Sequence, residues 1–108
     1  MNDKILSLLG LCRRAGKVTI GNDAVIDMVT KQKAKLVIMA KDLSENTAKK
    51  ILINSHKNNV KALALNRTKD ELSAALGKFC AVISINDGGF ANKLETLISE
   101  ENQQEACI

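Results

Sequence analysis

The sequence contains no proline and few aromatic residues. Phenylalanine occurs twice among its 108 residues, and tryptophan and tyrosine do not occur. No segment is therefore stiffened or broken by a proline ring, and any hydrophobic core has to be built from aliphatic side chains. Apolar residues make up 45% of the chain, which is enough for such a core. A chain of this length is typical of one folded domain.

Long apolar runs and targeting patterns are also lacking. The run at residues 36–40 is far shorter than the roughly 20 residues that a membrane-spanning helix needs. The first residues do not show the basic, apolar and small-residue order of a secretory signal. We therefore expect a cytoplasmic protein with no membrane association.

Residues suited to catalysis or metal binding are scarce. The three cysteines, Cys12, Cys80 and Cys107, lack the spacing of metal ligands, so we interpret them as reduced thiols without a chemical role. The single histidine, His56, lies in a polar stretch at a helix end, where it favours the helix dipole. No dinucleotide fingerprint or phosphate-binding loop is present. We expect no enzyme activity, no metal and no cofactor.

Positive charge is in excess and is unevenly distributed. The chain has 16 lysines and arginines against 12 acidic residues, a net charge of +4. Residues 99–108 contain three glutamates and no basic residue, so the body without them carries +7. A basic body suggests a polyanionic partner, although many soluble proteins are simply basic. We expect one domain over residues 1–98 and a frayed acidic tail over residues 99–108.

Helical and extended patterns alternate along the chain. The spacing of apolar residues predicts five helices, at 4–14, at 22–32, after Ser44, from Thr68 to near Gly77, and from about residue 90. Short apolar or β-branched runs predict strands at 18–20, 36–40, 60–65 and 80–85. The helical stripes place Ala24 and Leu52 among the inward residues. Thr68 and Glu71 have the spacing of a capping box. This alternation predicts a sheet between two layers of helices.

Polar residues gather at the turns between strands and helices. Gly21, Asn22 and Asp23 open the second predicted helix, where Asn22 or Asp23 can act as a cap. Residues 66–69 and 77–79 lie on later connections. Loops that leave the same end of a sheet converge, so these turns would bring helix N-termini, cations and short polar side chains together. RNA requires such a mixture, because cations hold phosphates, Asn or Asp reads base edges, and an aromatic ring supports an unstacked base.

Four segments carry a resemblance to a known family. They are Leu8–Lys17, Ala34–Asp42, Asn46–Lys50 and Asp87–Leu94. Together they resemble the kink-turn RNA-binding ribosomal-protein family, L-seven-Ae/L-thirty-e, and most closely its bacterial YlxQ-type branch, over residues 3–98. The resemblance implies an α/β fold, a three-layer αβα sandwich with a mixed four-stranded sheet. It also implies binding to kinked RNA and a place in translation or a ribonucleoprotein.

The resemblance further implies where RNA would bind. In the family, a Gly-x-Asn-Glu-x-x-Lys segment opens the second helix, and its polar side chains contact the sheared guanine–adenine pairs of the kink. Here Gly21 matches, Asp23 takes the Asn position, Ala24 replaces Glu and Asp27 replaces Lys. The exchange at Asp27 turns attraction to phosphate into repulsion. Lys31 follows one turn later and can partly neutralise that carboxylate.

The turns and the resemblance together give a candidate RNA-binding set. It consists of Gly21, Asn22, Asp23, Lys31, Arg67, Lys69, Lys78 and Phe79. The expected partner is a kink-turn or other structured RNA, including ribosomal RNA or the ribosome, and the expected state is a monomer. Ala24 and Asp27 leave an alternative open, a protein-interaction module of the same fold with weakened kink-turn recognition. An enzyme of the doubly wound type is a third hypothesis, which a small molecule bound at the strand ends would favour.

Overall fold

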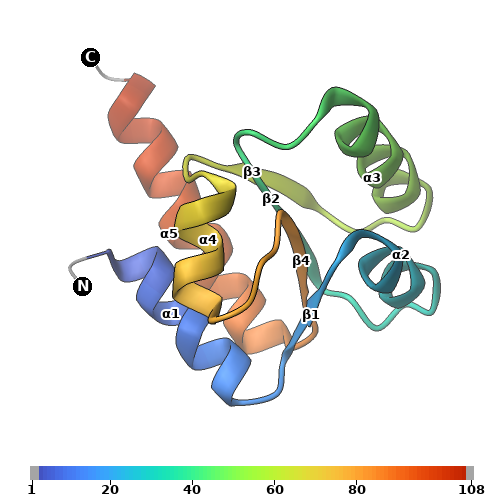
Figure 1. The fold of residues 1–108 in the computed structure, drawn as a ribbon, viewed down its shortest axis with the longest axis horizontal. Helices are drawn as coiled ribbons and strands as arrows, with labels where there is room; N and C mark the ends of the chain where they lie inside the picture. Colours follow the sequence, from blue (N-terminus) through green and yellow to red (C-terminus); the bar gives the residue numbers. More distant parts are fainter. Residues whose placement is uncertain (1–2, 107–108) are drawn as a thin grey trace.

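The structure of the protein is a computed structural model that describes residues 3–106. Five helices and four strands alternate within these residues (Figure 1). The helices are α1 (Lys4–Arg14), α2 (Asn22–Thr30), α3 (Glu45–Lys57), α4 (Lys69–Leu76) and α5 (Gly88–Ala106). The strands are β1 (Val18–Ile20), β2 (Leu36–Ala40), β3 (Ala62–Leu65) and β4 (Val82–Ile85).

The four strands form one mixed sheet in the order β1-β4-β2-β3. Strands β2 and β3 are parallel, whereas β4 is antiparallel to both of its neighbours. Strands β1, β2 and β3 therefore run in one direction and β4 runs in the other. Helices α2 and α3 cover one face of the sheet, and α1, α4 and α5 cover the other (Figure 1). The predicted three-layer αβα sandwich with a mixed four-stranded sheet is confirmed.

The core divides between the two faces of the sheet because strand side chains alternate in direction. In β2, Leu36, Ile38 and Ala40 join the cluster under α1, α4 and α5, whereas Val37 and Met39 join the cluster under α2 and α3. All five residues are buried. The continuous apolar run seen in the sequence is thus a strand covered on both sides, as predicted. The core is aliphatic, and the largest fully buried side chains are Leu, Ile and Val.

Two predicted helix starts have the capping contacts that their sequences indicate. The Ser44 hydroxyl accepts a hydrogen bond from the Thr47 amide at the start of α3. At the start of α4, the Thr68 hydroxyl accepts from the Glu71 amide at 3.1 Å. The Glu71 carboxylate accepts from the Thr68 amide at 3.0 Å, which completes the capping box.

The bounds of three elements and the exposure of Leu52 differ from the predictions. Strand β3 begins at Ala62 rather than residue 60, since the Val60 amide donates to a carbonyl at the end of α3. Strand β4 begins at Val82 rather than residue 80, since the Cys80 amide donates to the Ser73 hydroxyl at 2.9 Å. Helix α2 ends at Thr30 rather than residue 32. Leu52 is exposed rather than inward.

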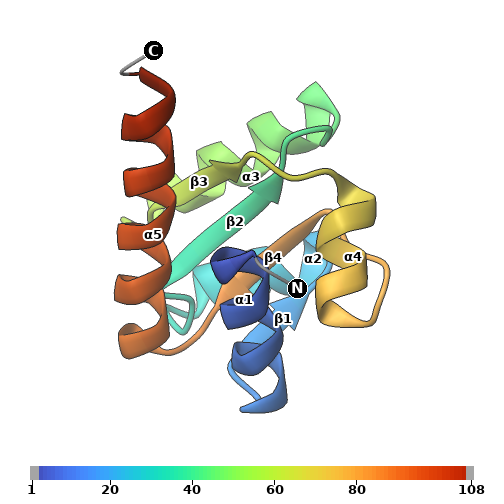
Figure 2. The ribbon, with the colours of Figure 1, turned by 90° about the vertical axis from the view of Figure 1, so that its left-hand side faces the viewer.

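The C-terminal segment also differs from the prediction of a frayed tail over residues 99–108. Helix α5 continues through Ala106 and extends beyond the sheet (Figure 2). Its extension is tied to the body, because Glu101 forms an ion pair with Arg67. The domain boundary placed at residue 98 therefore falls inside a helix, and residues 107 and 108 lie outside the described part. Within residues 3–106 we find no helix with the length and apolar character of a membrane span.

Candidate functional site

Four connections meet at one edge of the sheet, because β1, β2 and β3 end there and β4 begins there (Figure 1). They are residues 21–24, 41–44, 66–69 and 77–81, and we call this edge the rim. The pairing register supports the arrangement, since Ile20 lies opposite Ile83 and Met39 lies opposite Val82. The polar turns that the sequence pointed to do converge.

Backbone hydrogen bonds tie neighbouring parts of the rim to one another. The Gly21 amide donates to the Val82 carbonyl at 3.2 Å, and the Ala40 amide donates to the Ala81 carbonyl at 2.8 Å. The Lys41 amide donates to the Arg67 carbonyl at 2.9 Å. The connections are therefore held in a fixed order along the edge, with 77–81 between the start of α2 and the end of β2.

The start of α2 presents two polar side chains with no partner in the described part of the chain. Gly21 is the N-cap and has φ 106°, a backbone conformation that favours glycine. No side chain caps the helix, so the prediction that Asn22 or Asp23 is the cap is wrong. The Asn22 and Asp23 side chains are exposed, and neither makes a hydrogen bond or ion pair with the side chains or backbone of residues 3–103. Uncapped amides and free polar side chains can therefore meet a ligand here.

The outer face of α2 carries Asp23, Asp27 and Lys31 at successive intervals of four residues. Ala24 is also exposed, which corrects the prediction that it points inward. Lys31 Nζ lies 3.0 Å from Asp27 Oδ2, so the predicted pair is present. Lys31 lies about 12 Å along the helix from Asp23, at a rise of about 1.5 Å per residue. It is therefore not part of the rim, although it was placed in the candidate set.

The β2–α3 connection contributes to the rim and was missing from the candidate set. The Lys69 amide donates to Asp42 Oδ1 at 2.8 Å, which joins the start of α4 to the residues after β2. Lys41, beside Asp42, is exposed. The rule that connections at one end of a sheet converge could have found both residues, because they directly follow a predicted strand.

The 77–81 connection presents a cation and an aromatic ring. Gly77 has φ 74° and ends α4 in the left-handed conformation. Lys78 is exposed and Phe79 is 74% exposed. An exposed ring beside a lysine is suited to stacking against a planar group near negative charge. Lys78 and Phe79 thus lie on the connection whose last residue, Ala81, bonds to the rim at Ala40.

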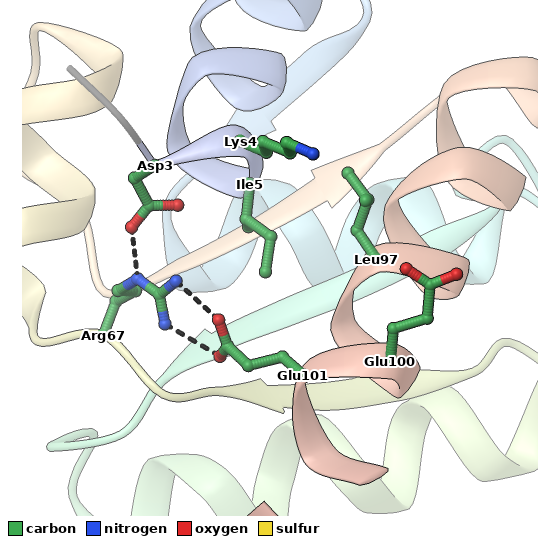
Figure 3. Close-up of a pocket in the computed structure, with 7 residues that line it drawn as sticks. All are labelled: Asp3, Lys4, Ile5, Arg67, Leu97, Glu100 and Glu101. Atoms are coloured by element: carbon green, nitrogen blue, oxygen red, sulfur yellow. Dashed lines mark hydrogen bonds and ion pairs between the residues drawn. The ribbon is translucent and has the colours of Figure 1, made fainter. Parts of the chain in front are cut away.

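Arg67 belongs to a different arrangement, which we call the clamp and define by Asp3, Arg67 and Glu101 (Figure 3). Arg67 Nε donates to Asp3 Oδ2 at 2.6 Å, and its two terminal nitrogens donate to the Glu101 carboxylate at 2.9 and 2.7 Å. The Arg67 side chain is only 13% exposed. Its charge is therefore engaged by two carboxylates of the protein, and a direct contact of Arg67 with RNA stays a prediction.

The electrostatics of the clamp favour the charged forms of Arg67 and Asp3. The hydrogen bonds that Arg67 donates to Glu101 and to Asp3 raise the pKa of Arg67 above its ordinary value. The hydrogen bond from Arg67 in turn lowers the pKa of Asp3. No local pattern could have revealed these contacts, because Arg67 is 64 residues from Asp3 and 34 from Glu101.

The described residues offer little for covalent or metal chemistry. Within residues 3–106, no group of three or more His, Cys, Asp or Glu side chains is arranged to hold a metal ion. Burial raises the pKa of the Cys12 thiol to about 11 and also raises the pKa of Cys80. Such thiols stay protonated and are poor nucleophiles. His56 is exposed in the last turn of α3, as predicted, and Cys107 lies outside the described residues.

Comparison with known proteins decides the family. The model of the ribosomal protein L7Ae/L30e/S12e/Gadd45 family matches residues 3–95. The chain belongs to this family. The L7Ae/L30e/S12e/Gadd45 relatives include the RNA-binding protein YlxQ of Enterococcus faecium, 39% identical over 88% of this chain and 91% of that protein. YlxQ of Bacillus subtilis (strain 168) is 40% identical over 84% of this chain and 91% of the relative.

Solved structures agree with the family assignment. A protein of unknown function from Bacillus halodurans C superposes with a TM-score of 0.85 at 34% identity, covering 89% of this chain and 97% of the other. The Giardia lamblia 15.5kD RNA binding protein gives a TM-score of 0.72 at 18% identity, covering 93% and 92% of the two chains. At that identity the second comparison supports the L7Ae/L30e/S12e/Gadd45 fold alone.

Proposed function

We propose that this protein binds structured RNA at the rim and prefers a kinked helix, such as a kink-turn, to a straight duplex. The observation that carries the proposal is the polar start of α2, where the exposed Asn22 and Asp23 side chains have no partner within residues 3–103, next to the connection that carries the exposed Lys78 and Phe79 and leads to Val82. The chain belongs to a family in which similar bacterial proteins are named RNA-binding.

The chemistry of the rim supports a shape preference. Lys69, Lys78 and the uncapped start of α2 can contact phosphates, which fixes position without reading sequence. Asn22 and Asp23 offer amide and carboxylate oxygens, which can accept hydrogen bonds from the amino and imino groups of guanine. A-form RNA keeps its major groove too narrow for side chains, whereas a bend exposes base edges and unstacked bases. The exposed ring of Phe79 can stack on such a base.

The proposal has further parts that follow from the same features. We infer that the activity is binding without catalysis, that the protein acts as a cytoplasmic monomer, and that its RNA is ribosomal or another structured RNA. The high pKa of the Cys12 thiol is consistent with the absence of a nucleophile. No cofactor is required for the contacts described above.

The test is a titration of a kink-turn RNA and a straight duplex of equal length between about 50 and 200 mM salt. We expect tighter binding to the bent RNA at every salt concentration. The double variant Asn22→Ala/Asp23→Ala should lose the difference between the two RNAs while keeping a similar salt dependence, because it removes base contacts rather than cations. Equal and steeply salt-dependent affinity of the unaltered protein for both RNAs would leave only phosphate attraction and would contradict the shape preference.

One observation favours a second function. Ala24 is exposed beside Asp23, and Asp27 is held in an ion pair on the same helix, so α2 lacks two groups that would strengthen RNA binding. The alternative is a protein-interaction module, associated with translation or ribosomes, that has kept the fold but recognises kinked RNA weakly.

A further inference from the structure

We propose that the clamp of Asp3, Arg67 and Glu101 positions the 66–69 part of the rim for RNA, so that the last turns of α5 govern binding without touching the RNA. Arg67 is then a positioning residue rather than a contact. The inference rests on the proposed function for its effect on affinity, and its mechanical part can be measured without RNA.

The 66–69 connection is held from both of its sides. On the side of β2, the Arg67 carbonyl accepts from the Lys41 amide and the Lys69 amide donates to Asp42. On the other side, the Arg67 guanidinium reaches out of the connection to α1 and α5 (Figure 3). The same guanidinium also donates to the Asn66 carbonyl at 2.8 Å, so it is hydrogen-bonded to the backbone of its own connection as well.

The geometry of the clamp makes it a firm attachment. Arg67 meets Glu101 through two parallel N–H···O contacts, the arrangement in which arginine and carboxylate bind most specifically. Asp3 uses its second oxygen to accept from the Leu6 amide at 3.1 Å, so it is fixed as the N-cap of α1. The three side chains are between 13% and 27% exposed, and pairs so sheltered are screened by salt much less than surface pairs.

The clamp does not leave Arg67 free to bind phosphate. Two carboxylates already face the guanidinium, and each would have to be displaced before an RNA phosphate could take its place. Lys69, two residues later, has no ion-pair partner among the side chains of residues 3–103 and lies on the connection that the clamp fixes. The most direct effect of the clamp is therefore on the position of Lys69 and its neighbours.

The source of the clamp within the chain is unexpected. The family model matches residues 3–95, whereas Glu101 lies six residues beyond that match, on the extension of α5. Glu101, which makes the bidentate contact with Arg67, lies in the segment that was predicted to be a frayed acidic tail. Residues outside the family-defined body are thereby connected to a rim that lies within it.

The test compares Glu101→Gln with the control Glu100→Gln. Both variants remove one negative charge from the same turn of α5, but Glu100 is an exposed neighbour that makes no ion pair within residues 3–106. Each protein is studied well below its unfolding temperature. We expect Glu101→Gln to bind kink-turn RNA about tenfold more weakly, which corresponds to about 1.4 kcal/mol, with a salt slope that is shallower, because the cation that loses its position is Lys69. Glu100→Gln should bind as the unaltered protein does.

Amide hydrogen exchange in the absence of RNA separates this proposal from the proposed function. We expect faster exchange at Thr68 and Lys69 in Glu101→Gln and no change in Glu100→Gln. If exchange at these amides is the same in both variants, or if both bind RNA equally, the clamp does not position the rim. Tighter binding of Glu101→Gln with a steeper salt slope would also overturn the proposal, because it would show that a released Arg67 contacts phosphate. Failure of the unaltered protein to distinguish bent from straight RNA would instead count against the proposed function.

Discussion

Single side chains on α2 set the expected strength of RNA binding. Asp23 brings a carboxylate to the rim, and Asp27 places a second one a turn further along the same face. A carboxylate accepts hydrogen bonds from base donors but repels phosphate, so these residues favour selectivity over affinity. The Asp27–Lys31 pair stabilises the helix little, since both side chains are 57% exposed and surface pairs of this spacing contribute about 0.3–0.5 kcal/mol.

Replacing one of these carboxylates separates the two candidate functions. We expect Asp27→Lys to tighten binding to kink-turn RNA by tenfold or more, about 1.4 kcal/mol, because phosphate repulsion becomes attraction near the rim. Asp27→Asn should give an intermediate gain. The measurement is a titration of both variants with bent and straight RNA. If neither RNA responds to either change, the protein-interaction module becomes the better explanation.

The candidate site could be predicted from sequence only where its residues are close to a turn. Gly21, Asn22 and Asp23 stand directly after a predicted strand, so the edge that they occupy follows from the alternation of elements. The partners of Arg67 could not be predicted, because ion pairs over 34 and 64 residues depend on how α1 and α5 pack beside the β3–α4 connection. An arginine on a polar turn therefore looked like an RNA contact although it is engaged inside the protein.

The helices and strands were predictable in order and type but not at every end. The spacing of apolar residues identified the five helices of residues 3–106, and short apolar or β-branched runs identified the four strands. Both signals depend on residues close together in the sequence. Where a strand begins later than predicted, a hydrogen bond to the preceding helix decides it, as when the Ser73 hydroxyl on α4 accepts from the Cys80 amide. The length of α5 was underestimated because its last turns carry few apolar residues, and an ion pair that the sequence does not reveal holds Glu101.

The capping box of α4 gives a prediction at the scale of one element. Thr68→Ala removes the acceptor for the Glu71 amide at the end of the helix that borders the rim. We expect a loss of about 1 kcal/mol in the free energy of unfolding, the usual effect of losing such a cap. Chemical denaturation of the variant measures it.

Thr96→Ala is the matched control for that experiment. The Thr96 hydroxyl also makes a local hydrogen bond, to the Asn92 carbonyl at 3.0 Å, but it lies inside α5 rather than at a cap. Because alanine has the higher helix propensity, this variant should be unchanged or slightly more stable. Equal losses in the two variants would mean that the Thr68 cap has no special effect.

At the scale of the whole molecule, the clamp links Asp3, at the start of α1, to Glu101 on α5 and makes the free energy of unfolding depend on pH. The hydrogen bond from Arg67 lowers the pKa of Asp3 in the folded state below its unfolded value of about 3.9. The stabilisation from this carboxylate is therefore complete above that value and is lost as the pH falls through the lower, folded pKa.

We expect the unaltered protein and the variant Asp3→Asn to differ in how steeply their melting temperatures fall with pH. The melting temperature of the unaltered protein should fall as the pH is lowered from about 5 to 2. Asp3→Asn should melt lower near pH 7 but lose less over the acidic range, because it has no carboxylate to protonate at this position. Thermal unfolding followed by circular dichroism across that range checks the prediction. Parallel curves would show that Asp3 does not contribute to acid sensitivity.

The place of β4 in the sheet has a consequence for the order of events during synthesis. This strand lies between β1 and β2, yet it is the last of the four to leave the ribosome. Strand β1 has no partner until β4 arrives some sixty residues later, and sheets closed by such distant pairings form slowly. The rim needs the same strand, because Gly21 and Ala40 bond to residues 81 and 82. A nascent chain that has not yet exposed β4 therefore cannot form the completed rim.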